Sequence, residues 1–141
     1  IVLSGKNKDL EKLTELLKEY SIKNIKLPVS APFHCSLMSK ATDIMSEELN
    51  KISFSKGSNN LISNVTAEVI SSTEDLKSLL IKQIENRVRW RESVKNMINN
   101  DVDHFIEIGP GKVLSGLIKR INRDVEISTV NSQEDVENLK V

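Results

Sequence analysis

The sequence has little of what several classes of protein require. It contains one cysteine, Cys35, which excludes an internal disulfide and a zinc site built from several cysteines and suits a reducing cytosol. No apolar run approaches the roughly 20 residues of a transmembrane helix, and no metal-binding spacing such as H-E-x-x-H or C-x-x-C occurs. The 20 basic and 20 acidic side chains cancel, so no net charge attracts nucleic acid or an anionic membrane. We therefore expect no metal, no nucleic acid and no membrane partner.

One pentapeptide is also missing. Enzymes that attack a carbonyl with an activated serine on an α/β scaffold place that serine on a G-x-S-x-G elbow. No such pentapeptide occurs in the 141 residues. The sequence begins with Ile-Val-Leu, without methionine and without the layout of a signal peptide. We therefore expect it to start within a longer protein.

Helical and extended patterns alternate along the chain, against an ordinary globular composition of 38% hydrophobic and 28% charged residues. Strand patterns cover residues 1–4, 24–30, 61–65, 104–108 and 125–130. The first helical pattern follows a candidate cap at Asn7 or Asp9. Further helical patterns begin at about Cys35 and at Thr73, and others cover residues 87–99, 113–121 and 133–139. This alternation predicts the α/β class. Strand, helix and strand within residues 1–30 predict either a βαβ-type unit or half of a ferredoxin-like unit.

His34 is the first candidate for chemistry. Pro32 fixes its own φ and keeps Ala31 out of the helical region, so a loop precedes the predicted helix. A histidine held in such a loop can act as a general base, because imidazole changes charge near neutral pH. The alternative is an ordinary surface histidine. That is our only interpretation of His104, which precedes an apolar strand with no partner pattern around it.

Cys35 stands next to His34, which raises the question of a Cys–His dyad. We reject it, because nucleophile and base normally meet across a fold rather than along the chain. A packed, inert thiol is the better interpretation.

The turn Gly109-Pro110-Gly111-Lys112 lies between a predicted strand and a predicted helix, as anion-binding turns do. It does not match the phosphate loop G-x-x-x-x-G-K-[ST], because the spacing is too short and Val113 replaces the hydroxyl residue. Two glycines and a proline favour a tight structural turn.

Four blocks of the sequence resemble a known family. They are residues 27–38 (LPVSAPFHCSLM), residues 62–65 (ISNV), a helical stretch that contributes residues 82–84, 88–90 and 92–94, and residues 105–117 (FIEIGPGKVLSGL). In order and spacing they are similar to segments of bacterial malonyl-CoA:acyl-carrier-protein transacylases, and together they span nearly all of the chain. One departure is residues 85–87, which stand where that family often has an aromatic residue and a proline.

The resemblance implies a large α/β-hydrolase-like acyltransferase subdomain with a small ferredoxin-like subdomain inserted in it. Residues 1–33 would be the second half of the small subdomain, and residues 34–141 the C-terminal part of the large one. The N-terminal half of such an enzyme would hold the serine elbow, the oxyanion-hole donors and an arginine for the malonyl carboxylate. That half is the first expected partner of this chain.

The resemblance also implies a ping-pong transfer in the cytoplasm, as part of fatty acid biosynthesis and without a separate cofactor. The serine attacks malonyl-CoA with His34 as general base, and the phosphopantetheine thiol of acyl carrier protein then takes the malonyl group. The main-chain carbonyl of Gln83 would orient His34. Phe33 and Asn64 are candidates for the acyl pocket, with a core phenylalanine and a structural asparagine as the alternatives.

Three interpretations stay open at this point. In the first, the chain is the C-terminal part of a malonyl transferase and is inactive alone because the serine is absent. In the second, it is a non-catalytic module that binds acyl carrier protein or a partner subunit. In the third, it is part of the acyltransferase domain of a larger synthase. Because a piece of a domain exposes faces that are normally covered, we also expect self-association through apolar surface.

Overall fold

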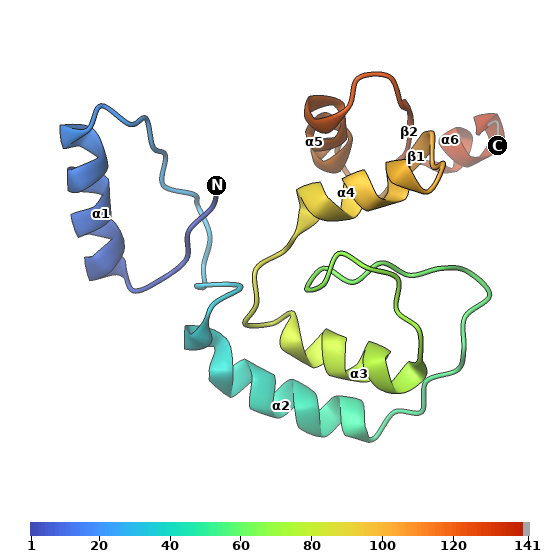
Figure 1. Ribbon diagram of the computed structural model, residues 1–141, viewed down its shortest axis with the longest axis horizontal. Coiled ribbons are helices and arrows are strands. Elements are labelled where there is room, and N and C mark those ends of the chain that lie inside the picture. The colour runs from blue at the N-terminus through green and yellow to red at the C-terminus, as the bar shows by residue number, and fades with distance from the viewer. Residues whose placement is uncertain (140–141) are drawn as a thin grey trace. The chain divides into compact units, whose positions relative to one another are not determined.

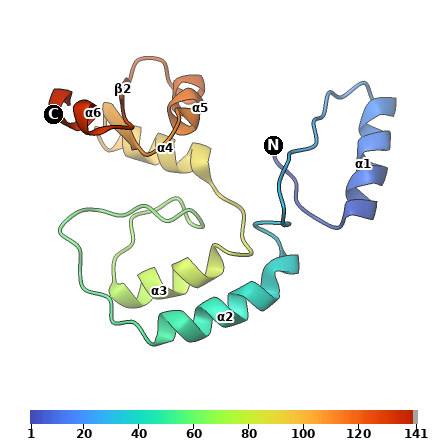
Figure 2. The ribbon, with the colours of Figure 1, turned by 180° about the vertical axis from the view of Figure 1, so that it is seen from behind.

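A computed structural model describes residues 1–139 and divides the chain into two compact units, Ile1–Val88 and Arg89–Val141 (Figures 1 and 2). Helices are combined with a small parallel sheet, so the predicted α/β class is confirmed. Within the described residues, no helix has the length and the apolar content needed to cross a membrane.

The second unit is a helix followed by a strand–helix–strand motif and a short last helix. Its elements are α4 (Trp90–Asn99), β1 (His104–Ile108), α5 (Val113–Ile121), β2 (Glu126–Val130) and α6 (Gln133–Asn138). The strands pair in parallel, with His104 opposite Glu126 and Ile108 opposite Val130. Parallel strands need a crossover connection, and α5 supplies it.

The core of this unit is made by side chains from α4, from α5 and from the strand region. Val94 of α4 is completely buried and packs with three other buried residues, Phe105, Ile118 and Val125. Partly buried apolar side chains surround this cluster: Trp90, Met97, Ile98, Ile121 and Ile127. The helical spacing within α4 and α5 therefore places one apolar face of each against the strands.

The first unit consists of helices joined by long irregular segments. Its elements are α1 (Asn7–Glu19), a 3₁₀ turn (Ser36–Met38), α2 (Ser39–Asn50) and α3 (Thr73–Lys82). Helices α2 and α3 lie side by side (Figures 1 and 2). The Ser72 hydroxyl caps α3 by accepting from the Asp75 amide at 3.0 Å. A serine at the N-cap explains why the helix begins at Thr73, as predicted.

Three predicted strands are wrong. Residues 1–4 and 24–30 belong to no sheet within the described chain, and residues 61–65 form only a single antiparallel bridge, between Ile62 and Val69. An alternating apolar pattern supplies a face for packing, but a strand also needs a neighbour for its backbone hydrogen bonds. Neither segment within residues 1–30 finds such a neighbour. The predicted helix 87–99 also begins later, at Trp90.

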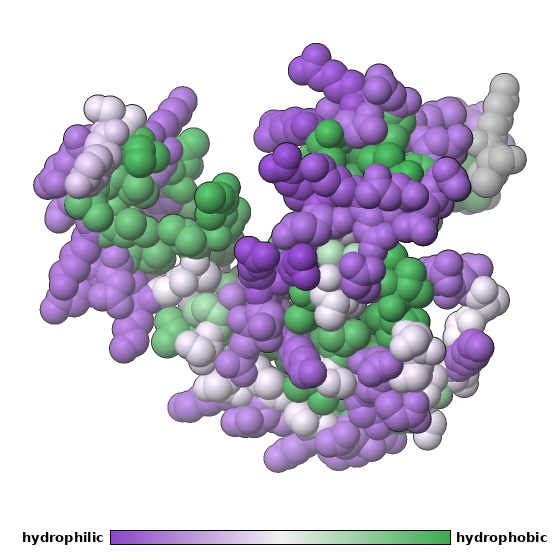
Figure 3. All heavy atoms as spheres, viewed as in Figure 1, coloured by the Kyte–Doolittle hydropathy of each residue, from purple (hydrophilic) through white to green (hydrophobic). Residues whose placement is uncertain are grey.

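Many large apolar side chains of the first unit remain exposed. Ile25 is 77% exposed, Val29 62% and Ile44 63%. Hydrophobic surface is visible in Figure 3 around the part of the chain that carries α1. Only Leu49 and Ala67 are buried apolar residues in the described part of this unit.

Candidate functional site

His34 lies in the short loop between the Pro32 turn and the 3₁₀ turn that leads into α2. Its φ is 61°, in the left-handed region, which few non-glycine residues adopt. Such a conformation costs about 1–3 kcal/mol and persists only where surrounding contacts impose it. The side chain itself is exposed, so packing alone does not hold it in place.

Two main-chain carbonyls from the end of α3 hold the imidazole. Nδ1 of His34 lies 2.9 Å from the Gln83 oxygen and 3.1 Å from the Asn86 oxygen. Carbonyl oxygens only accept hydrogen bonds, so Nδ1 must carry the hydrogen. The neutral ring then presents Nε2 as an unprotonated nitrogen that can accept a proton. This is the tautomer that a histidine base requires.

The structure therefore brings His34 and the Gln83 carbonyl together, whereas their catalytic roles stay a prediction. The Asn86 carbonyl is an additional partner that the sequence did not reveal. A carbonyl belongs to every residue alike, so no side-chain pattern marks the ones that bind a histidine. The signal in the sequence is the asparagine itself, a residue type that is found in some proteins just after the last turn of a helix.

Asn64 contacts the same turn through its side chain. Its Nδ2 donates to Gln83 Oε1 at 3.2 Å. It belongs to a tight turn in which the Val65 amide donates to Ser63 Oγ at 3.1 Å and the Ala67 amide to the Ser63 carbonyl at 2.8 Å. The structure thus joins Asn64 to Gln83, and a role in an acyl pocket stays a prediction.

Phe33, the residue before His34, is 49% exposed. This exposed half of the side chain can border a site or be covered by another part of the protein. The acyl-pocket role and the core alternative therefore both stay predictions.

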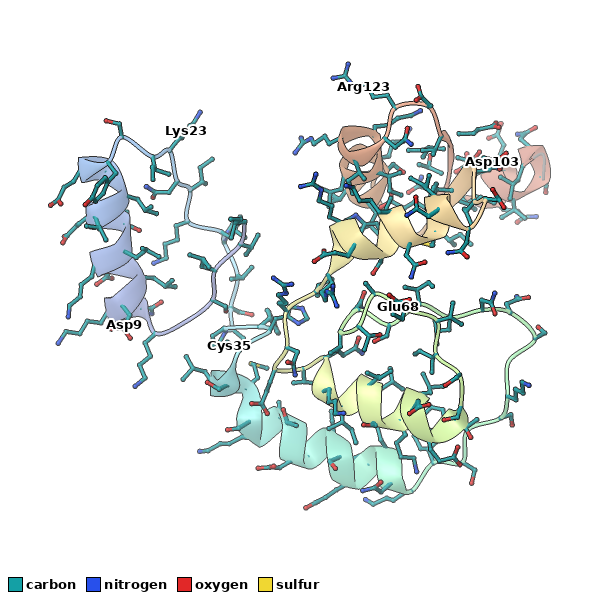
Figure 4. All side chains as sticks on the ribbon, viewed as in Figure 1. Asp9, Lys23, Cys35, Glu68, Asp103 and Arg123 are labelled. Atoms are coloured by element: carbon teal, nitrogen blue, oxygen red, sulfur yellow. The ribbon has the colours of Figure 1, made fainter. Side chains whose placement is uncertain are left out.

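The other candidate side chains have structural partners. The Cys35 thiol donates to the Pro32 carbonyl at 3.2 Å, beside the first turn of the α2 segment (Figure 4). His104 Nε2 lies 2.8 Å from Ser128 Oγ, which ties β1 to β2. In residues 1–139, no group of three or more His, Cys, Asp or Glu side chains is arranged to hold a metal ion.

The Gly109-Pro110-Gly111-Lys112 turn leads into a helix whose N-terminal donors are already occupied. Glu107 Oε1 accepts from the Leu114 amide at 3.0 Å, and Oε2 accepts from the Ser115 amide at 2.7 Å and the Ser115 hydroxyl at 2.5 Å. These bonds, the Ser115 hydroxyl first, hold the pKa of Glu107 below its usual range. The carboxylate fills the place that an external anion would take, so the turn is structural.

Comparison with known proteins agrees with the family resemblance. No protein-family model matches the chain. The malonyl CoA-acyl carrier protein transacylase of Bacillus subtilis is 43% identical over 138 residues, which is 97% of this chain. The chain spans 44% of the length of that relative.

Solved structures agree as well. The malonyl CoA-acyl carrier protein transacylase from Clostridium perfringens is 43% identical with a TM-score of 0.85, covering 92% of this chain and 41% of that one. A malonyl-transacylase in complex with its type II PKS acyl-carrier protein is 32% identical with a TM-score of 0.88, covering 95% of this chain and 44% of that one. Homology to part of these enzymes is thereby established, and the fold matches a C-terminal part of them.

Proposed function

We propose that this chain, homologous over nearly its whole length to malonyl CoA-acyl carrier protein transacylases, is the part of such an enzyme that carries the general base. The complete protein transfers a malonyl group from malonyl-CoA to the phosphopantetheine thiol of acyl carrier protein. The observation that carries the proposal is the hydrogen bond from His34 Nδ1 to the Gln83 carbonyl, because it leaves Nε2 free to accept a proton.

The proposed reaction has two half-reactions. A serine on the N-terminal half attacks the thioester carbonyl of malonyl-CoA, and His34 Nε2 takes the serine proton and gives it to the departing CoA thiolate. In the second half-reaction, His34 takes the proton of the phosphopantetheine thiol as that thiol attacks the malonyl-serine ester. The proton then returns to the serine oxygen. The carbonyls on Nδ1 orient the ring but add no full negative charge.

The proposed organisation follows the same homology. Residues 1–33 are assigned to the second half of an inserted small subdomain, and residues 34–141 to the C-terminal part of the large one. The exposed apolar side chains of the first unit, Ile25 and Val29 among them, support the N-terminal half as a partner. In its absence the same surface favours self-association. The neighbour solved with its acyl-carrier protein supports acyl carrier protein as the acceptor.

Acyl selectivity is assigned to Phe33 and Asn64. Phe33 precedes the base directly and is half exposed, and Asn64 bonds to the residue whose carbonyl orients the base. A methyl group in such a pocket is worth about 1–3 kcal/mol, so selectivity for malonyl over a methylated analogue is moderate.

A malonyl-transfer assay on two forms of the protein tests the proposal. The complete protein that contains this chain should transfer malonyl from malonyl-CoA to acyl carrier protein, and the 141-residue chain alone should not. A complete protein that binds acyl carrier protein without any transfer would instead establish the non-catalytic module.

A further inference from the structure

The turn that follows α3 is closed on a single acceptor, the carbonyl oxygen of Lys82. Three donors converge on it: the Asn86 side-chain amide at 2.7 Å, the Asn86 main-chain amide at 3.1 Å and the Glu85 amide at 3.3 Å. A carbonyl has two lone pairs, so the shortest contacts carry most of the interaction. The Asn86 side chain therefore makes the main bond that closes this turn.

The closed turn presents both carbonyls that bind His34. The Gln83 oxygen comes from its first residue and the Asn86 oxygen from its last, and both lie within 3.1 Å of the same nitrogen. Asn86 therefore contributes in two ways. Its side chain closes the turn by donating to the Lys82 carbonyl, and its own carbonyl accepts from Nδ1 of His34. One N–H shared between two carbonyls is a three-centre bond of the kind common at helix ends.

The strain at His34 shows why two acceptors matter. The residue has a φ of 61° and an exposed side chain, so local backbone preference and packing leave the ring orientation unfixed. The two carbonyls are its hydrogen-bond partners in the described chain, and they lie 49 and 52 residues further along the sequence. Losing one acceptor weakens the preference for hydrogen on Nδ1.

We propose that Asn86 is a positioning residue for His34: by bonding to the Lys82 carbonyl, its side chain holds two carbonyls on Nδ1 and fixes the tautomer that frees Nε2. The inference rests on the proposed function for its catalytic meaning, but the tautomer is measurable without any transfer reaction.

The chain contains a matched control. Asn100 closes the end of α4 with the same pair of bonds, from its side-chain amide to the Asn96 carbonyl at 2.8 Å and from its main-chain amide to the same carbonyl at 3.1 Å. It lies in the second unit, away in sequence from His34. Asn100 Nδ2 also donates to Asn96 Oδ1 at 2.8 Å. Asn100→Ala therefore removes the equivalent helix-end bond together with this second side-chain bond, and any effect specific to His34 should be absent.

The test is an NMR measurement of imidazole nitrogen shifts, at a pH where the rings are neutral, on the chain labelled with ¹⁵N at histidine. The chain has two histidines, and His104→Gln assigns their signals. In the unsubstituted chain we expect Nδ1 of His34 to be protonated and Nε2 to be bare. Asn86→Ala should raise the share of the opposite tautomer about fivefold, the equivalent of one hydrogen bond of about 1 kcal/mol. Asn100→Ala should leave the spectrum unchanged.

Two results would overturn the inference: hydrogen on Nε2 of His34 in the unsubstituted chain, or an unchanged spectrum in a folded Asn86→Ala variant. Asn86→Ser, whose hydroxyl can donate to the Lys82 carbonyl, serves if the alanine variant does not fold, and should give an intermediate tautomer share. In the complete protein, kcat/KM should fall for Asn86→Ala, by at most about fivefold. A complete protein without transfer activity would refute the proposed function and leave the tautomer result intact.

Discussion

The two units of this chain are built in different ways. The second unit, although shorter, buries five apolar side chains in its described residues: Val94, Phe105, Ile118, Val125 and Val130. The first unit buries two, Leu49 and Ala67, and leaves Ile44 63% exposed in the middle of α2. A strand–helix–strand motif with a covering helix closes its own core, whereas helices joined by irregular segments do not.

The two units also differ in which of them carries the proposed base. His34 belongs to the unit with the smaller core, and its ring is held by donating to two carbonyls of a turn rather than by packing. The second unit has the larger buried core. It offers no candidate base, since the His104 ring makes a hydrogen bond with the Ser128 hydroxyl. Substitutions in the first unit should therefore change activity, whereas substitutions in the second unit should change the free energy of unfolding.

The largest expected effect is that of His34→Ala on malonyl transfer. Removing a general base typically costs about 10²–10⁴-fold in rate, and we expect kcat/KM of the complete protein to fall by that amount. The control is His104→Gln in the second unit, which keeps a polar side chain at the position that contacts the Ser128 hydroxyl. Equal losses of kcat/KM in both variants would mean that activity depends as much on His104 in the second unit as on His34 in the first.

Val94→Ala should give the largest change in stability. Val94 is completely buried among Phe105, Ile118 and Val125, so the substitution removes two methyl groups and leaves a cavity. We expect the free energy of unfolding to fall by about 2–3 kcal/mol, measured by urea denaturation. Ile44→Ala, at a site 63% exposed, should cost less than about 0.5 kcal/mol. Similar losses at both sites would mean that the first unit also has a packed core.

A smaller, pH-dependent effect is expected at Glu107, which caps α5. Bonds from Ser115 lower its pKa in the folded state, so it adds stability above its unfolded pKa and loses it as the pH falls through the folded value. Glu107→Gln should therefore be less stable at neutral pH and should lose less on acidification. Urea midpoints between pH 7 and the acid range test this. Ser115→Ala, which removes the hydroxyl bond only, should give an intermediate slope.

The sequence predicted the second unit better than the first. The strands at 104–108 and 125 to 130 and the helix between them are confirmed nearly residue for residue, because apolar periodicity and a Gly-Pro-Gly turn determine them locally. In the first unit, α1 and α3 are confirmed but the strand patterns at 1–4 and 24–30 are not. Strand formation depends on a neighbour that periodicity does not specify.

The sequence likewise predicted some residues of the candidate site and missed others. His34 stands out because a proline loop precedes it, and the family resemblance pointed to Gln83. Asn86 was missed, although its carbonyl lies 3.1 Å from Nδ1 of His34, because a backbone acceptor and a side-chain bond that closes a turn leave no motif in the sequence. Glu107 was also missed, since a carboxylate that caps a helix seven and eight residues later in the chain leaves no short motif.

The smallest expected effect on activity is that of Gln83→Ala, although Gln83 touches the base. Its carbonyl survives the substitution, and the side chain makes one exposed bond, accepting from Asn64 at 3.2 Å. Such a bond is worth about 1 kcal/mol, so kcat/KM of the complete protein should fall by less than about fivefold.

Asn64→Ala removes the same bond from the other side, and it gives the Gln83→Ala measurement its control. The double variant should lose little more than either single variant, as expected for two residues that share one interaction. A near-total loss in Gln83→Ala alone would instead mean that the side chain itself takes part in the reaction. The proposal that a backbone turn, rather than a side chain, orients His34 would then fail.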